Sequence, residues 1–187
     1  SAMRLKGYAT SGQSAPGGSN QRWPVNYRAV SCARLADAVR ITKRGDRMRA
    51  YYNENDPYAA EWLRNLIAAG HIAEGVVDDR SIAEVTGAEL AAFDQCHFFA
   101  GIGGWPLALR LAGWGDSRPV WTGSCPCQPF SAAGKGLGEK DPRHLWPEFR
   151  RLIAECRPAI VFGEQVASKA GRGWLARVRA DLEGLAY

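Results

Sequence analysis

The amino-acid sequence predicts an α/β fold built on one doubly wound, mostly parallel β-sheet. First, strand-like and helix-like patterns alternate from residue 49 onward, which is typical of parallel sheets with helices on both faces. Second, glycines, prolines and capping residues separate these segments. Third, the residues suited to chemistry follow the predicted strands, and ligands of such sheets bind at the carboxyl ends of strands. The 187 residues, 46% of them hydrophobic, suffice for one such core.

Residues 1–48 are predicted to be an irregular, basic region. They lack a sustained hydrophobic period apart from a short helix expected from Ser31 to Ile41. The first 50 residues carry ten Lys or Arg against two Asp or Glu, and the whole chain has a net charge of +5. A basic region suits the phosphate backbone of a nucleic acid, although a solvated surface explains the charge equally well. We therefore expect two parts, residues 1–48 and a core of residues 49–187.

Two strand–helix units open the core. Residues 49–53 predict a strand, and the Asp-Pro pair at residues 56–57 predicts a helix start, because Asp caps helices and Pro suits the first turn. We expect this helix to end at Gly70, which suits a left-handed C-cap. A second strand is expected to end at Asp78, before a short helix that begins near Thr86.

The second half of the core continues the alternation. A buried strand at residues 96–99 leads into a glycine-rich turn. The later elements are a helix ending before Gly113, a strand at residues 119–122, a glycine-rich loop at residues 131–141, a helix around residues 145–153, a strand at residues 159–162 and a helix at residues 174–182 that ends before Gly184.

The turn FAGIGG at residues 99–104 is the first candidate site. Glycine lets a ligand approach the backbone, and the N-terminus of the following helix offers free amides. The spacing differs from the dinucleotide fingerprint, because the third glycine directly follows the second. A purely structural turn is an alternative. The residues expected to bind a cofactor here are Phe99, Ala100, Gly101, Gly103 and Gly104.

Two acids follow the predicted strands upstream of that turn. Glu54 suits hydrogen bonds to ribose hydroxyl groups, and Asp78 suits an adenine amino group. Asp79 is a rival for the second contact, and each acid alone fits an ordinary surface carboxylate. Asn55, beside Glu54, belongs to the same expected cofactor site.

The run SCPCQPFS at residues 124–131 carries the strongest chemical signal. A thiolate is a nucleophile, and a turn near a helix N-terminus or a basic group would promote its ionisation. One residue separates Cys125 from Cys127, and no second Cys or His pair completes a zinc site, so we expect no metal. We assign Cys127 as the nucleophile, with a structural thiol as the alternative.

Glu164 follows the strand at residues 159–162 and is the candidate acid. A carboxyl group buried against a base has a raised pKa, so it could protonate a ring nitrogen or form a hydrogen bond with it. A lone Glu at a strand end usually has no such role.

Taken together, these motifs resemble the DNA cytosine-5 methyltransferase family. Residues 99–104 are similar to its cofactor motif, residues 125–131 to its nucleophile motif, and residues 164–166 to its Glu-Asn-Val motif, with Gln165 replacing Asn. The resemblance implies the Rossmann-like sheet of class I S-adenosylmethionine-dependent methyltransferases, here incomplete at the C-terminus. It implies methyl transfer from S-adenosylmethionine to C5 of a flipped cytosine in double-stranded DNA, with S-adenosylhomocysteine as the product.

The resemblance also implies residue roles. Cys127 would attack C6 of the flipped cytosine, Glu164 would contact N3 and the exocyclic amine, and the loop at residues 131–141 would close over DNA. The other expected substrate contacts are Pro126, Gln128 and Ser131.

The order of the motifs departs from that family. There the segments with the ribose-binding acid and the adenine-contacting Asp follow the glycine turn, whereas here Glu54 and Asp78 precede it. We interpret this as a circular permutation of the cofactor half, which would leave neighbouring strands side by side. The family's Gln-x-Arg-x-Arg segment, target-recognition domain and closing Gly-Asn motif have no match up to Tyr187, so we expect a partial catalytic core.

Three other functions remain open. The same chemistry could act on tRNA, as in one branch of this family. The other class of RNA cytosine-5 enzymes attacks from a Thr-Cys motif, and here two residues separate Thr122 from Cys125. A catalytically silent module that binds a nucleic acid or the cofactor is the second alternative. A nicotinamide oxidoreductase, the third, would explain the glycines but leave residues 126–128 without a role.

Composition narrows the cellular context. No stretch approaches the roughly 18 apolar residues of a membrane span. The five cysteines are odd in number and irregularly spaced, which fits a reduced protein better than a disulfide framework. We expect a cytoplasmic, prokaryotic or phage-encoded monomer, active in DNA methylation within restriction–modification.

Overall fold

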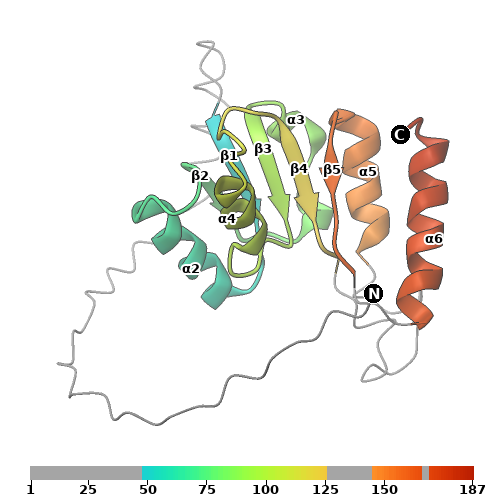
Figure 1. Cartoon of the computed structure of the whole chain (residues 1–187), viewed down its shortest axis with the longest axis horizontal. Helices are drawn as coiled ribbons and strands as arrows, with labels where there is room; N and C mark the ends of the chain where they lie inside the picture. Colours follow the sequence, from blue (N-terminus) through green and yellow to red (C-terminus); the bar gives the residue numbers. More distant parts are fainter. Residues whose placement is uncertain (1–47, 126–144, 166–168) are drawn as a thin grey trace, which may run out of the picture. The chain divides into compact units, whose positions relative to one another are not determined.

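Five strands form one sheet among the residues described by the structure, a computed structural model, which are residues 48–125, 145–165 and 169–187. The strands are β1 (Met48–Asn53), β2 (Gly75–Asp78), β3 (Phe93–Phe98), β4 (Val120–Gly123) and β5 (Val161–Phe162). They lie in the order β2-β1-β3-β4-β5, and every neighbouring pair is parallel (Figure 1). The predicted α/β fold with a parallel sheet is confirmed. The expected helix at residues 31–41 and the loop at residues 131–141 lie outside the described residues, and the division at residue 48 stays a prediction.

Helices connect these strands and cover both faces of the sheet (Figure 1). They are α2 (Pro57–Ala68), the 3₁₀ turn η2 (Ile82–Glu84), α3 (Gly87–Leu90), α4 (Gly104–Leu111), α5 (Trp146–Cys156) and α6 (Lys169–Gly184). The predicted caps of α2 are present: the Asp56 carboxylate accepts a hydrogen bond from Ala59 N at 2.8 Å, and Gly70 follows the helix with a φ of +71°. No helix in the described ranges is long and apolar enough to cross a membrane.

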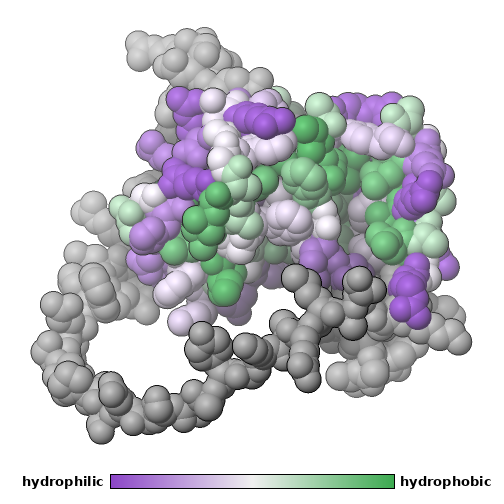
Figure 2. All heavy atoms as spheres, in the orientation of Figure 1, coloured by the Kyte–Doolittle hydropathy of each residue, from purple (hydrophilic) through white to green (hydrophobic). Residues whose placement is uncertain are grey.

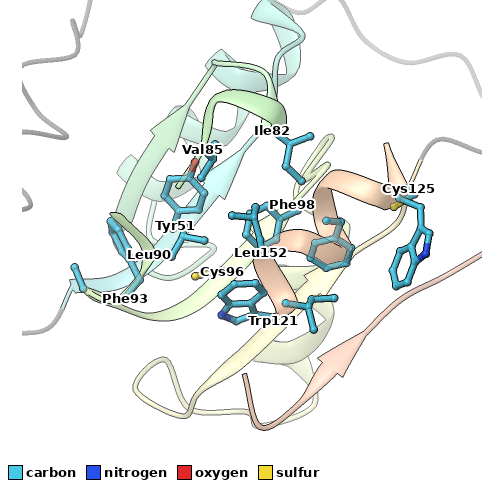
Figure 3. Packing of buried hydrophobic residues seen from close by; sticks show 14 of the residues in the cluster. Tyr51, Ile82, Val85, Leu90, Phe93, Cys96, Phe98, Trp121, Cys125 and Leu152 are labelled. Atoms are coloured by element: carbon cyan, nitrogen blue, oxygen red, sulfur yellow. The ribbon is translucent and has the colours of Figure 1, made fainter. Parts of the chain in front are cut away.

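The alternation of side chains along β1 shows which helices cover which face. Tyr51 belongs to a large apolar cluster with residues of α3 and α5, whereas Tyr52 belongs to a smaller cluster with Leu63 of α2. Figure 3 shows the large cluster, in which Phe98 and Trp121 from the central strands lie beside Leu152 of α5. The sheet is therefore buried on both sides, as expected for parallel strands.

A buried polar group lies at the centre of the α2 face. His97 of β3 has no exposed surface, and its ring stacks on Tyr52 with ring centroids 5.1 Å apart. Its Nδ1 lies within hydrogen-bonding distance of Thr122 Oγ1, at 2.8 Å. Burial lowers the pKa of His97 to about 3, so the imidazole is neutral at physiological pH. Its hydrogen bonds satisfy it within the core, where it takes a structural role.

The connection from β3 through α4 to β4 has an unusual hand. The step from β1 to β2 runs toward one edge of the sheet and the step from β3 to β4 toward the other, yet α2 and α4 lie on the same face (Figure 1). Two crossovers that run in opposite directions over one face have opposite hands. Because the strands point downward in Figure 1 with both helices in front, β1–α2–β2 is right-handed and β3–α4–β4 is left-handed. About 98% of such crossovers are right-handed.

The left-handed unit bears on the predicted permutation. If the chain ran from α4 into β1 instead of β4, it would move toward the opposite edge with the same helix in front, and the crossover would be right-handed. In a permuted cofactor half, β1, β2 and β3 keep their neighbours in the sheet, but α4 leads into β4 and not into β1. This change of order produces the left-handed crossover that is observed.

Two predicted strands have clearly different limits. The strand predicted at residues 159–162 contains only Val161 and Phe162 in β5. The sequence predicted residues 96–99, but β3 begins at Phe93 and ends at Phe98. Phe99 has a φ of +52°, which is outside the extended region, so it belongs to the turn.

Candidate active site

The glycine turn joins β3 to α4 at the carboxyl edge of the sheet. Phe99, Gly101 and Gly103 have φ angles of +52°, +54° and +82°, so the backbone makes a compact turn in which only Phe99 is strained by its side chain. Ala100 N donates a hydrogen bond to Asn53 O at 3.1 Å, which ties the turn to the end of β1. The turn and the segment after β1 thus form one surface.

The three glycines of this turn differ in what surrounds them. A Cβ added at Gly103 would lie 2.9 Å from Leu66 Cδ1, so it would displace the Leu66 side chain of α2, and the φ of +82° also favours glycine. A Cβ added at Gly101 or Gly104 would meet nothing within 4 Å. The backbone at these two positions therefore borders open space that a ligand can occupy.

Glu54 reaches across from the end of β1 to the glycine turn. Its Oε2 accepts a hydrogen bond from Gly101 N at 2.7 Å, and its Oε1 accepts one from Asp56 N at 2.9 Å. The carboxylate keeps lone pairs for further donors, since two oxygens offer about four acceptor sites. The structure thus brings Glu54 and the glycine turn together, and Asn55 lies exposed beside them.

Asp78 is enclosed by protein. It is buried and accepts hydrogen bonds from the Tyr51 hydroxyl at 2.7 Å and from Arg80 Nη2 at 2.7 Å. Burial opposes ionisation of Asp78, but the hydrogen bonds from Arg80 and Tyr51 outweigh it and lower its pKa. Asp79 is exposed and pairs with Arg64 at 3.3 Å. Asp78 therefore binds two protein groups, and its contact with adenine stays a prediction.

The cysteine turn begins at the end of β4. Ser124 and Cys125 are the last described residues before a gap, so most of the predicted nucleophile motif lies outside the described residues. The residues that fall there are Pro126, Cys127, Gln128 and Ser131.

Cys125 points into the core. Its side chain is buried at one end of the large cluster, with Trp146, Phe149 and Val178 (Figure 3). Burial raises the pKa of the Cys125 thiol to about 12, so the thiol stays protonated at neutral pH. A protonated thiol is a poor nucleophile.

Glu164 follows β5, the neighbour of β4, and its side chain is exposed. A Cβ added at Gly163 would lie 3.2 Å from Gly123 O, so the carboxyl ends of the two strands are in contact. Cys125 and Glu164 both line a cavity of about 240 Å³ bounded by β4, β5, α5 and α6. The structure thus brings the start of the cysteine turn and the candidate acid together.

A larger cavity of about 490 Å³ lies at the amino ends of the strands, away from the candidate site. It is lined by residues near the amino ends of β3 and β4, such as Phe93 and Val120, and by Cys156 of α5. None of the predicted site residues lines it. Size alone is thus a poor guide to the site in this fold, in which ligands bind at the carboxyl ends of strands.

Sequence reasoning missed an aromatic group between the two turns. The indole N–H of Trp105 donates a hydrogen bond to Ser124 Oγ at 2.9 Å, and its ring stacks on Phe162 with centroids 5.9 Å apart. Trp114 packs edge-on against the same Phe162 ring, with centroids 6.0 Å apart. A tryptophan directly after two glycines, and a serine before Cys-Pro-Cys, were the signals available in the sequence.

The described ranges also contain no group of three or more His, Cys, Asp or Glu side chains that could hold a metal ion.

Comparison with known proteins identifies the region around the cysteine turn. Residues 115–168 match the model of the C-5 cytosine-specific DNA methylase family. This match includes β4, the cysteine turn, α5, β5 and Glu164. No solved structure matches the chain at a significant level.

Three bacterial proteins are similar in sequence to parts of this chain. The Type II methyltransferase M.NgoMIV of Neisseria gonorrhoeae is 45% identical over 51 residues, which cover 27% of this chain and 16% of that protein. M.PspPI of Psychrobacter is 30% identical over 138 residues, covering 51% of this chain and 33% of the relative. M.AplI of Arthrospira platensis is 39% identical over 70 residues, 36% of this chain and 20% of the relative.

This chain thus spans no more than about a third of the length of these relatives. The family match and the three relatives agree on one class of protein, and the fold and the position of Glu164 fit it. The chain therefore contains a segment of the C-5 cytosine-specific DNA methylase family.

Proposed function

We propose that this chain contributes the cofactor site and the nucleophile to an enzyme that methylates C5 of cytosine in DNA, with S-adenosylmethionine as methyl donor. The family match supports the reaction, and the convergence of the glycine turn, the cysteine turn and Glu164 at one edge of the sheet supports its location. The relatives are named Type II methyltransferases, which supports a role in DNA methylation within restriction–modification.

One observation carries the assignment of the nucleophile. Cys125 is buried in the core, and its pKa is raised to about 12 by burial. At neutral pH only about one thiol in 10⁵ with that pKa is ionised. The burial of Cys125 therefore supports Cys127 as the nucleophile of the pair.

The residues would act in sequence on a cytosine flipped out of the duplex. The Cys127 thiolate forms a bond to C6, and Glu164 donates a proton or a hydrogen bond to N3, so that the electron pair of the C5–C6 double bond becomes available at C5. S-adenosylmethionine supplies an electrophilic methyl group when bound. After methylation, a base removes the C5 proton and the C6–S bond breaks, which restores the ring and the thiolate. Pro126, Gln128 and Ser131 would hold the base in place.

The upstream half fits the cofactor. The open space beside Gly101 and Gly104 would take the amino-acid and ribose portions, and the lone pairs that remain on Glu54 would accept hydrogen bonds from ribose hydroxyl groups. Asn55 and Asp78 would border the adenine. The other members of this site are Phe99, Ala100 and Gly103.

The family match does not extend into this upstream half, because its first matched residue is 115. A linear family model cannot align segments that occur in a different order, and the left-handed β3–α4–β4 connection marks such a change of order. Both observations support a permuted cofactor half.

Covalent trapping tests the proposal. In duplex DNA that contains 5-fluorocytosine, fluorine cannot leave as a proton, so the enzyme stays bound to C6 after methyl transfer. We expect an adduct that depends on S-adenosylmethionine, persists in Cys125→Ala and disappears in Cys127→Ala. Loss of the adduct in Cys125→Ala alone would refute the assignment.

Two comparisons separate the alternatives. Methyl incorporation into tRNA but not into duplex DNA would indicate the RNA substrate. Calorimetric binding of S-adenosylhomocysteine without any adduct, even after a longer form of the protein is supplied, would indicate a silent binding module. Binding of NAD in place of S-adenosylhomocysteine would point to the oxidoreductase.

A further inference from the structure

Trp105 contacts all three segments of the candidate site. It belongs to the first turn of α4, directly after the glycine turn, and its indole N–H donates to Ser124 Oγ at 2.9 Å. Its ring lies nearly parallel to that of Phe162, with an interplanar angle of 8° and centroids 5.9 Å apart. Phe162 ends β5, two residues before Glu164. One side chain therefore links the cofactor turn, the cysteine turn and the strand that carries the acid.

The hydrogen bond fixes the direction in which the cysteine turn leaves the sheet. Successive side chains of a strand point to opposite faces, and here Ser124 faces α4 whereas Cys125 is buried on the α5 side. Ser124 is held by Trp105 on the α4 side of the sheet, and Cys125 is held by the core on the α5 side. The backbone that continues toward Cys127 therefore starts from a defined position.

The left-handed crossover explains why Trp105 can make this contact. α4 lies on the α2 face and the chain then enters β4, so the helix that begins at the glycine turn is also the helix directly before the cysteine strand. The aromatic ring spans from the first turn of this helix to the ends of β4 and β5. Half-buried, it makes a hydrogen bond in an environment partly shielded from water.

We propose that Trp105 is a positioning residue, which holds Ser124, from which the chain continues to Cys127, and thereby sets the reactivity of the Cys127 thiol. This proposal rests on the proposed function, because it assumes that Cys127 is the nucleophile. The hydrogen bond holds Ser124, and the stack on Phe162 orients the indole that donates it. Trp105 itself does not contact the reacting atoms.

The test measures the alkylation rate of Cys127 by iodoacetamide as a function of pH, with the modified cysteine located by tandem mass spectrometry. Trp105→Phe keeps a ring on Phe162 but removes the N–H donor, and Ser124→Ala removes the acceptor. We expect each variant to react about fivefold more slowly at pH 7, the effect of one neutral hydrogen bond. The pH profile separates a change in the ionisation of the thiol from a change in its access to the reagent.

The double variant and two controls distinguish positioning from general damage. If both residues act through one hydrogen bond, Trp105→Phe with Ser124→Ala should be no slower than the slower single variant. Ser124→Thr keeps the hydroxyl and should restore the wild-type rate. Trp114→Phe alters the other side of Phe162 without touching the cysteine turn, and it should leave the rate unchanged.

The outcomes are decisive for this residue. Unchanged or faster alkylation in the single variants, or effects that multiply to about 25-fold in the double variant, would overturn the proposal. Binding of S-adenosylhomocysteine, measured by calorimetry on the same proteins, reports separately on the proposed function. If the wild-type chain does not bind this cofactor product, the proposed function fails at its cofactor site, while the alkylation cycle still decides the role of Trp105.

Discussion

The two halves of this sheet organise their functional groups in different ways. In the cofactor half, β1 to α4, charged and backbone groups hold the site together: Glu54 bonds the amide of Gly101, and Arg80 encloses Asp78. In the nucleophile half, β4 to α6, aromatic packing surrounds the site: Phe162 stacks on Trp105 of α4, and Cys125 belongs to the aromatic core. Only the second half matches the family in linear order. Linear motifs thus support the proposed nucleophile, whereas spatial neighbours support the proposed cofactor site.

The largest effect should come from removing the charge that encloses Asp78. Arg80→Met leaves a buried carboxylate with Tyr51 as its remaining side-chain partner, so we expect the free energy of unfolding to fall by about 3 kcal/mol. Urea denaturation measures the loss. The matched control is Arg64→Met, whose partner Asp79 is 63% exposed, and it should cost less than about 1 kcal/mol.

The pH dependence of this difference is fixed by the direction of the pKa shift. The pKa of Asp78 is lowered in the folded state, so the stabilisation is complete above the unfolded pKa of about 4 and is lost as the pH falls through the folded value. Wild type and Arg80→Met should therefore converge in stability in acid. A constant difference down to pH 2 would show that the ion pair is not its source.

A second, smaller effect should separate the glycines of the cofactor turn. Gly103→Ala combines a φ of +82° with a Cβ that would lie 2.9 Å from Leu66, so it should destabilise by about 2 kcal/mol. Gly104→Ala, which meets no atom within 4 Å, should leave the unfolding free energy unchanged. If the cofactor lies in that open space, Gly104→Ala should instead weaken S-adenosylhomocysteine binding at least tenfold, on the order of 1.4 kcal/mol. Unaltered affinity in a stable Gly104→Ala variant would place the cofactor elsewhere.

Sequence patterns predicted features of this molecule that depend on local chemistry or on strand order. The Asp56 cap and the Gly70 helix end follow from propensities of single residues, and the meeting of Glu54 with the glycine turn follows from adjacent parallel strands. The enclosure of Asp78 was missed, since an acid at a strand end gives no sign of whether a nearby Arg is buried against it. The Trp105 contact depends on the hand of a crossover, and hydrophobic periodicity carries no information about hand.

The nucleophile half makes a prediction about alkaline stability. The pKa of Cys125 is raised to about 12 in the folded state, so its contribution is complete below the unfolded value and is lost as the pH rises above it. Between pH 8 and pH 10 we expect wild type to lose about 1.4 kcal/mol of unfolding free energy more than Cys125→Ala does. Cys127→Ala should keep the wild-type slope over this range if Cys127 is the accessible cysteine of the pair. Parallel curves for wild type and Cys125→Ala would show that Cys125 is not buried.

The smallest effect tests the junction between β1 and the glycine turn. Glu54→Gln keeps the shape of the side chain but has one acceptor oxygen, so it loses one of the two hydrogen bonds from Gly101 N and Asp56 N and removes the charge from the other. Because the site is only half-buried, the loss of stability should be about 1 kcal/mol. Hydrogen exchange should quicken at these two amides and not at backbone amides of β5. If exchange quickened equally across the sheet, Glu54 would stabilise the fold as a whole. The contact between the end of β1 and the glycine turn would then depend on the pairing of the strands alone.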